Sequence, residues 1–369
     1  MHLDLDSFYA QCEENANPNL KGKAVVVCVY SGRTEDSGAV STANYEARKY
    51  GVKAGIPIAR AKKLLEGVYA AFVPMNHPYY EQVSERIMDI LRIQADAFEQ
   101  ASIDEAFLDV SARTAISFDA ARDAALEIKN QLVTQENVTA SIGIGPNKVI
   151  AKIASDQAKP DGLTVVKPED VPNFLSLLPV SRIPGVGKRA EEKLTQMKVS
   201  TIRQLSSLSP TILVETLGKS LGGYIYRASR GDDDDPVKER GQPIQFSRIA
   251  TLKQNTRRAE EVLPVLTVLA NSVSDKLKEH GLHCKSVATI AILTDLTIRS
   301  RSRMLESPSS EEKIIETTAR QLIQEFLQSN PEAVLRRLGV KASGLKKEAG
   351  QTDMSKFLTE PNQSSSSGT

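Results

Sequence analysis

Hydrophobic and polar residues alternate in short blocks over the first 166 residues, and the period of the pattern changes from block to block. A period of two predicts strands, and a period near 3.6 predicts helices. Their order is strand, helix, hairpin, helix, strand, which is a ferredoxin-like α+β layout. The blocks are an opening strand that contains Asp4, a helix at 79–98, a hairpin at 101–108, a helix at 120–132, a strand at 138–144, a helix that ends near 158 and a strand at 163–166.

Residues 11–76 interrupt this layout and predict a lobe of their own. The lobe has a buried-looking strand at 24–29 and a glycine-rich loop at 31–38. Ser41 or Thr42 is placed to cap a following helix at 43–50, which Gly51 would end.

The rest of the chain predicts two further units and a tail. Residues 167–230 read as short helices, and 231–245 is charged and contains two prolines, as interdomain linkers often do. Residues 246–341 predict a second small α+β domain, and the polar tail from 346 is typical of a disordered segment. The strands of this second domain are predicted at 286–293, 296–304 and 335–342, and its helices at 263–277 and 311–327.

Composition narrows the class of protein. With 369 residues, 40% hydrophobic and 25% charged, the chain is typical of a globular protein with several domains. Three cysteines without a CxxC pair favour a reducing compartment, and no apolar run reaches membrane-spanning length. We therefore expect a cytoplasmic protein. The net charge is only +1, but residues 241–349 hold 17 Lys and Arg against 12 Asp and Glu, which indicates a basic module for nucleic acid.

Two acidic pairs stand in apolar, strand-like surroundings, where an unpaired carboxylate is costly. Asp4 and Asp6 share one face of a strand, while Asp104 and Glu105 can converge only if the backbone turns at a hairpin. Carboxylates that meet at strand ends suit Mg²⁺. For either pair alone, a set of capping or surface acids beside a sheet edge is the more common explanation.

Two basic features are open to two interpretations each. Gly185, Gly187 and Lys188 open a helix and resemble a helix-hairpin-helix element that grips nucleic-acid backbone, or they form a tight interhelical turn. Arg299, Arg301 and Arg303 share one face of a strand by their spacing, either along a nucleic acid or as solvated side chains.

Four further motifs, in order along the chain, identify a family resemblance. They are LDLDSFYA at 3–10, STANYEAR at 41–48, ASIDEA at 101–106, and NK at 147 followed by AKPDG at 158–162. Together with the glycine hairpin and the basic second domain, they resemble the Y-family, translesion DNA polymerases of the DinB (DNA polymerase IV) branch, closest to archaeal members. The resemblance covers roughly residues 1–345.

The resemblance implies a catalytic site. Asp4, Asp104 and Glu105, with the backbone carbonyl of Leu5, would bind two Mg²⁺ ions, and Asp6 would support them. The nucleotide would contact Phe8, Tyr9, Thr42, Tyr45, Arg48 and Lys159, with Tyr9 as the steric gate against a 2′-hydroxyl. Thr42, Tyr45 and Arg48 are expected near one face of the short helix.

The resemblance also implies a right-hand fold: an α+β multidomain protein with a ferredoxin-like palm, small fingers, a helical thumb with helix-hairpin-helix and an α+β little finger. The expected bounds are palm 1–10 and 77–166, fingers 11–76, thumb 167–230, linker 231–243, little finger 244–341 and flexible tail 342–369. Small residues at Val29, Ala39 and Gly55 would leave the site open over the base pair, which implies low fidelity, and low processivity is expected. The DNA duplex would lie on Gly185, Gly187, Lys188, Arg248, Arg299, Arg301, Arg303, Arg336 and Arg337.

The tail carries a candidate sliding-clamp motif. Gln351, Met354, Phe357 and Leu358 fit the clamp-binding spacing, with Leu358 in place of the usual second aromatic residue. We expect partners in primer–template DNA, dNTP and a clamp, no membrane partner, and a monomer. Only three residues precede Asp4, fewer than is usual in the family, so either the start is internal or the first strand is short with a less well paired edge.

Two other functions fit part of the pattern. A nucleotide cyclase also places paired carboxylates on a ferredoxin-like palm, and a non-catalytic DNA-binding adaptor could recruit the clamp. The hairpin-helix motif and the basic domain oppose the first, and the intact acids with Tyr45 and Arg48 oppose the second.

Overall fold

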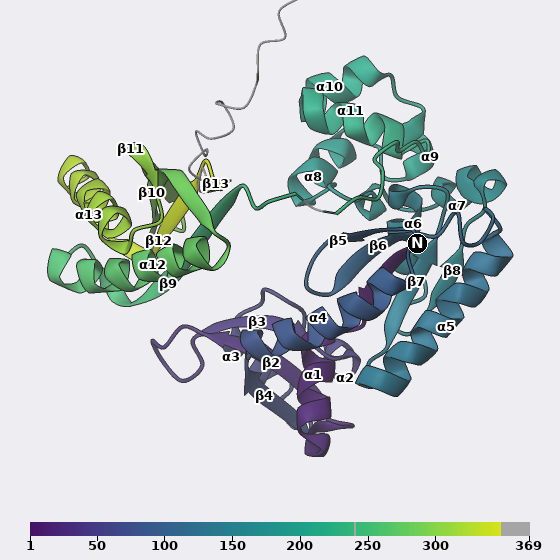
Figure 1. Cartoon of the computed structure of the whole chain (residues 1–369), viewed down its shortest axis with the longest axis horizontal. Helices are drawn as coiled ribbons and strands as arrows, with labels where there is room; N and C mark the ends of the chain where they lie inside the picture. The colour runs from purple at the N-terminus through teal and green to yellow at the C-terminus, as the bar shows by residue number, and fades with distance from the viewer. Residues whose placement is uncertain (240, 348–369) are drawn as a thin grey trace, which may run out of the picture. The chain divides into compact units, whose positions relative to one another are not determined.

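The structure is a computed structural model that describes residues 1–239 and 241–347. The described residues divide into two compact units (Figure 1), the first made of residues 1–30, 38–239 and 241 and the second of residues 31–37 and 242–347. In the described part of the chain, no helix is long and apolar enough to cross a membrane. Cys12, Cys28 and Cys284 are all buried and reduced.

A five-stranded sheet forms the centre of the first unit, with the strand order β5-β6-β1-β7-β8. The short strand β1 (His2–Leu5) is central and pairs antiparallel with β6 (Glu105–Asp109) on one side and β7 (Ala140–Ile144) on the other. Strands β5 (Ala97–Gln100) and β8 (Leu163–Val165) complete the sheet. The ferredoxin-like layout is confirmed. The expected poorly paired edge is wrong, because β1 has a partner on both sides.

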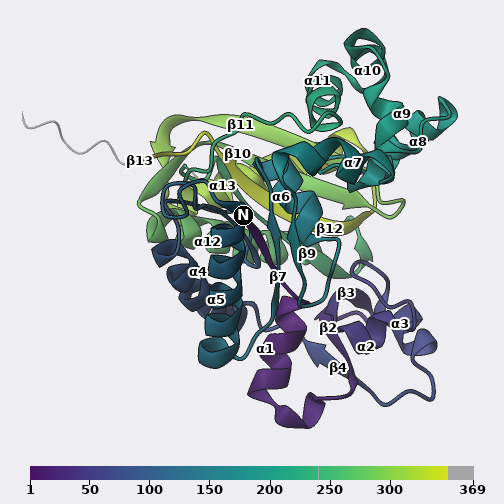
Figure 2. The same cartoon turned by 90° about the vertical axis from the view of Figure 1, so that its right-hand side faces the viewer.

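The two faces of this sheet are covered differently. Helices α4 (His77–Ile93) and α5 (Phe118–Glu136) pack on the face that carries Leu3 and Leu5, and form the main hydrophobic core with it (Figure 2). Helix α6 (Lys148–Ser155) packs on the opposite face. Gly143 on β7 permits this close packing, because a Cβ there would lie 2.0 Å from the carbonyl oxygen of Ala151.

The inserted lobe follows helix α1 (Phe8–Ala16) and the short 3₁₀ turn η1 (Pro18–Leu20), and has a three-stranded sheet with its own core. The predicted capping of its helix by Ser41 or Thr42 is wrong, because both residues belong to a strand. Asn44 caps the helix instead, accepting a hydrogen bond from the backbone N–H of Ala47 at 3.0 Å. The elements are β2 (Ala24–Tyr30), β3 (Gly38–Ala43), α2 (Tyr45–Arg48), α3 (Ile58–Leu64) and β4 (Ala70–Pro74).

Residues 167–230 are short helices, as predicted, and they pack around a core that they share with α6. Gly185 has a φ of +86°, a conformation that favours glycine, and α8 begins two residues after Val186. The elements are η2 (Pro168–Asp170), α7 (Val171–Ser176), η3 (Val180–Arg182), α8 (Lys188–Gln196), α9 (Ile202–Ser206), α10 (Pro210–Leu217) and α11 (Lys219–Ala228).

The predicted linker is partly anchored to the sheet domain. The Lys148 ammonium lies 2.6 Å from an Asp235 carboxylate oxygen and 2.7 Å from a Glu99 carboxylate oxygen. The Asn147 side chain donates to the carbonyl of Gly231 at 2.6 Å. The first part of the 231–243 segment therefore packs against α6 rather than extending away from it.

The second unit is a four-stranded sheet in the order β11-β10-β12-β9, to which a two-residue strand is added at β10. Two helices pack against it and form one core. The sequence did not predict β9, because its residues are mostly polar and exposed. The elements are β9 (Gln245–Thr256), α12 (Ala259–Glu279), β10 (Leu282–Leu293), β11 (Ile298–Ser309), α13 (Glu312–Ser329), β12 (Leu335–Ser343) and β13 (Lys346–Lys347).

Candidate active site

Strand pairing brings two of the predicted carboxylates together. In the antiparallel register of β1 and β6, Asp4 is directly opposite Glu105. Residues that face each other across two strands project to the same side of a sheet. Asp4 and Glu105 therefore share the face on which α6 packs, while Leu3 and Leu5 enter the core on the other face.

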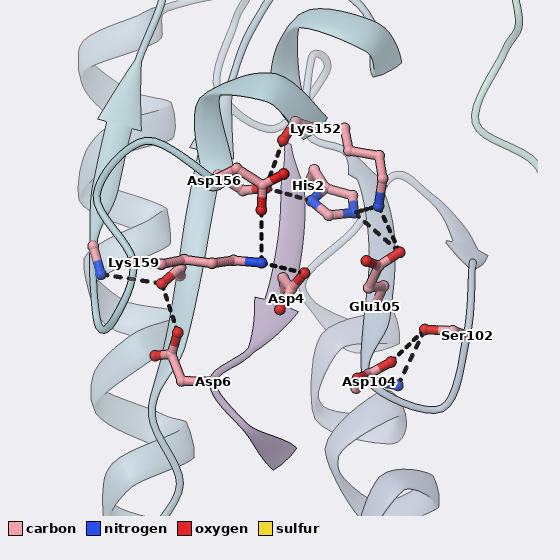
Figure 3. Close-up of polar contacts among 12 residues, drawn as sticks. His2, Asp4, Asp6, Ser102, Asp104, Glu105, Lys152, Asp156 and Lys159 are labelled. Carbon is pink, nitrogen blue, oxygen red and sulfur yellow. Dashed lines mark hydrogen bonds and ion pairs between the residues drawn. The ribbon is translucent and has the colours of Figure 1, made fainter. Parts of the chain in front are cut away.

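Each of these two carboxylates has a lysine partner (Figure 3). The Lys159 ammonium lies 2.5 Å from Asp4 Oδ2 and 2.7 Å from Asp156 Oδ1. The Lys152 ammonium lies 2.7 Å from Glu105 Oε2. The side chains of Asp4 and Glu105 are only 15% and 26% exposed, so these pairs are largely withdrawn from water.

The two carboxyl groups differ in protonation. Burial raises the pKa of Asp4 to about 7, the nearby charge of Glu105 acts in the same direction, and Lys159 opposes both. The pKa of Glu105 is held well below its usual range by His2 and then by Lys152, both of which lie beside its Oε2. Burial lowers the pKa of His2 itself. Near neutral pH Glu105 is therefore ionised, whereas Asp4 is ionised only in part.

The third predicted carboxylate does not join the other two. Asp104 precedes β6 and lies in the turn, where its Oδ1 accepts a hydrogen bond from the Ser102 hydroxyl at 2.6 Å (Figure 3). Across the described residues, no three Asp, Glu, His or Cys side chains gather closely enough to hold a metal ion. The expected convergence of Asp4, Asp104 and Glu105 is therefore not observed, because the turn ends at Asp104, one residue earlier than predicted, and directs Asp104 toward Ser102.

Asp6 follows β1 and is hydrogen-bonded to residues at the start of β7 and in the loop before β8. Its buried carboxylate accepts hydrogen bonds from the hydroxyls of Ser141 at 2.8 Å and Thr139 at 3.0 Å. The backbone N–H of Asp161 donates to it at 2.8 Å, which ties the loop before β8 to the end of β1. The backbone N–H of Leu5 donates to the carbonyl of Asp104 at 2.9 Å.

The predicted nucleotide residues come from α1, β3, α2 and the loop after α6. Tyr9 on α1 stacks on Tyr80, with ring centroids 4.4 Å apart and planes 20° apart, while Phe8 is buried in the core. The Arg48 guanidinium lies 4.5 Å from the centre of the Tyr45 ring. Burial raises the pKa of Tyr45, and the charge of Asp6 acts in the same direction. Thr42 is on β3, so the expectation of three residues on one helix is wrong.

The sequence did not reveal His2, Lys152 or Ser155 as parts of the site. His2 is fully buried, and its Nδ1 lies 2.8 Å from the Ser155 hydroxyl. Its position two residues before Asp4 on a strand was a usable signal, because both side chains then share a face. Lys152 is fixed by the packing of α6, which the sequence pattern does not specify.

The predicted DNA-contacting arginines of the second unit lie on both sides of its sheet. Arg299, Arg301 and Arg303 do share one side, opposite Ala291, Thr289 and Val287. That side carries the helices, and Arg303 lies 2.5 Å from a Glu325 carboxylate oxygen of α13.

Two more of these arginines lie on opposite sides of the sheet. Arg248 is opposite the buried Val340 and donates to the Ser272 hydroxyl of α12 at 3.2 Å. Arg337, opposite Ile292, is exposed on the other side of the sheet, and Arg336 is half-buried. A single track of arginines across one surface is therefore not observed.

Three family models match successive parts of the chain. The impB/mucB/samB family matches residues 3–156, and its C-terminal domain matches residues 243–354. The thumb domain of DNA polymerase iota matches residues 181–233. The order of these matches agrees with the order of the structural units.

Named relatives and solved structures cover nearly the whole chain. DNA polymerase IV of Nitrosopumilus maritimus is 44% identical over 97% of this chain and 98% of its own length, and that of Methanosarcina acetivorans is 43% identical over 96% and 98%. The Y-family DNA polymerase chimera Dbh-Dpo4(243-245)-Dbh superposes with a TM-score of 0.88, at 37% identity, over 94% of this chain and 99% of that one. An insertion ternary complex of Dbh DNA polymerase superposes with a TM-score of 0.67 at the same identity and coverage. The chain belongs to the Y family of DNA polymerases, in the DinB or DNA polymerase IV branch.

Proposed function

We propose that this chain is a translesion DNA polymerase that adds dNTPs to a primer 3′-OH, with Mg²⁺ held by Asp4 and Glu105 and joined by Asp104. The observation that carries the proposal is the pair of facing carboxylates, with a tyrosine ring and an arginine from neighbouring elements beside them. Family membership supports the same reaction.

The residues fit a divalent cation. Asp4 and Glu105 are hard oxygen donors in a site of low exposure, and two lysine ammonium groups now supply the positive charge there. Two bound Mg²⁺ ions would stabilise the attacking 3′-oxygen and the leaving pyrophosphate. Asp104 would have to exchange its hydrogen bond with Ser102 for a place beside Asp4.

Lys159 and Arg48 are proposed to bind the triphosphate. Lys159 is held by two carboxylates, so a polyphosphate can draw it away from Asp4 and leave that carboxylate for a cation. Arg48 donates from Nε to the carbonyl of Ala43 at 2.8 Å, which fixes its guanidinium at the end of α2.

Tyr9 is proposed as the steric gate, because stacking on Tyr80 restricts its ring. Low fidelity is proposed from three small residues that lie together at one edge of the lobe. Val29 is opposite Ala39 in the β2–β3 pair, and the backbone N–H of Gly55 donates to the carbonyl of the adjacent Val40 at 2.9 Å.

We also propose the domain bounds given above, a monomeric state and a cytoplasmic location. The primer–template DNA would be contacted by Gly185, Gly187, Lys188 and the arginines of the second unit. The DNA contacts are expected to be electrostatic and sensitive to salt. The clamp-binding residues Gln351, Met354, Phe357 and Leu358 lie outside the described residues, and their role is proposed from the motif alone.

Primer extension by the purified chain tests the proposal. Wild type should extend a primed template with dNTPs and Mg²⁺, while Asp104→Ala and Glu105→Ala should each abolish extension. Glu99→Gln is a matched control, because Glu99 on β5 also pairs with a lysine of α6 but faces no predicted ligand. Full activity in either alanine variant would refute the assignment, and a primer-independent cyclic product would favour a cyclase instead.

A further inference from the structure

One oxygen of Glu105 is already bound. The Lys152 ammonium lies 2.7 Å from Oε2, and His2 Nε2 lies 3.7 Å from the same atom. Figure 3 shows the other oxygen of Glu105 on the side of Asp4. One oxygen of the Glu105 carboxylate is therefore paired with Lys152, and the other is left for the predicted metal ion.

A buried chain of hydrogen bonds fixes Lys152. The Ser155 hydroxyl donates to the Lys152 carbonyl at 2.8 Å, so its oxygen accepts the hydrogen on His2 Nδ1, also at 2.8 Å. In a neutral ring Nε2 then keeps its lone pair, which faces the Lys152 ammonium at 3.4 Å. The His2 ring is held by Phe107, with ring centroids 4.6 Å apart.

A carboxylate held in this way can offer only one oxygen to a cation. Mg²⁺ requires near-octahedral geometry and usually takes one oxygen from each carboxylate, whereas the larger Ca²⁺ readily takes both. We propose that Lys152, anchored by His2 and Ser155, is the residue that sets cation specificity, because it restricts Glu105 to one-oxygen coordination and so disfavours Ca²⁺. This inference rests on the proposed role of Glu105 as a metal ligand.

A simpler role for Lys152 makes a different prediction. If Lys152 only neutralises Glu105, its loss removes the same repulsion from either divalent cation, and the affinities for Mg²⁺ and Ca²⁺ rise together. If Lys152 restricts coordination, the gain falls mainly on Ca²⁺. The ratio of the two affinities therefore separates the two roles.

Calorimetric titration of the full chain measures this ratio. Mg²⁺ and Ca²⁺ are titrated separately into the complex with dNTP and a primer–template that ends in a dideoxynucleotide, so that no bond forms. Lys152→Met should bind Ca²⁺ about tenfold more tightly, the size typical of a change behind a metal ligand, with less than about a twofold change for Mg²⁺. Lys152→Arg keeps the charge and the donors and should keep the wild-type ratio.

Lys148→Met is the matched control, because Lys148 is on the same helix and also bridges carboxylates, but of Glu99 and Asp235. It should leave both affinities unchanged. An unchanged Ca²⁺ to Mg²⁺ ratio in a folded Lys152→Met chain, or an equal gain for both ions, would overturn the inference. If Glu105→Gln alters neither cation binding nor primer extension, the proposed metal site itself is wrong; if Glu105→Gln abolishes both while Lys152→Met keeps the wild-type ratio, only the inference fails.

Discussion

The raised pKa of Asp4 predicts that this residue destabilises the metal-free protein at neutral pH. In the folded chain Asp4 has a pKa of about 7, because it is buried and faces Glu105. In the unfolded chain the pKa of an aspartate is about 4. Between these values the unfolded chain releases the proton and the folded chain keeps it, so the stability contributed by this group falls as pH rises.

Asp4→Asn removes this dependence. Each pH unit between the two pKa values costs the wild-type fold ~1.4 kcal/mol. The free energy of unfolding of Asp4→Asn minus that of the wild type should therefore rise by about 3 kcal/mol between pH 5 and pH 8. The variant also loses the ion pair with Lys159, which shifts its free energy of unfolding by a similar amount at both pH values. Most of this shift cancels when the two pH values are compared.

Urea unfolding followed by circular dichroism, with a chelator present, measures the difference at both pH values. Glu105→Gln serves as the companion variant, because removing one cause of the raised pKa should leave a smaller pH dependence of the same sign. A difference between Asp4→Asn and wild type that is flat from pH 5 to pH 8 would refute the reasoning. A difference that increases as the pH falls would refute it as well.

Three further predictions concern the nucleotide site and the tail. Tyr9→Ala should admit ribonucleotides, measured as the ratio of kcat/KM for dNTP and rNTP, and unchanged discrimination would place the gate elsewhere. Arg48→Met should raise the KM for dNTP about tenfold or more, as expected for loss of a charge-assisted contact worth ~1.5–3 kcal/mol, while Lys49→Met, whose lysine pairs with the exposed Glu46, should not. Deleting residues 350–369 should leave basal primer extension intact and remove stimulation by a sliding clamp; retained stimulation would show that the motif is fortuitous.

The sequence pattern predicted the architecture where periodicity was strong. The ferredoxin-like order followed from alternating blocks, and the position of Asp4 on a central strand followed from its apolar neighbours. Prediction failed at β9, whose residues are mostly polar and exposed, and at β3, whose residues are mostly small and partly buried, because neither strand has a clear period. Thr42 was assigned to a helix for the same reason.

The sequence predicted which residues form the candidate site, but not which of them face each other. Motifs selected Asp4 and Glu105, but only strand register shows that they face each other and that Asp104 stays in the turn. The contacts of Lys152 and His2 depend on α6 approaching β7 at Gly143, a tertiary contact that no local pattern specifies. The split of the arginines follows from which side of the sheet the helices cover.

Location of the bound metal tests the central claim most directly. Crystals of the full chain with primer–template DNA, dNTP and Mn²⁺ give anomalous peaks at the metal positions. We predict two peaks between Asp4 and Glu105, with Asp104 turned away from Ser102 to join them. Peaks elsewhere, or an Asp104 that keeps its hydrogen bond to Ser102 beside a bound nucleotide, would contradict the proposed site.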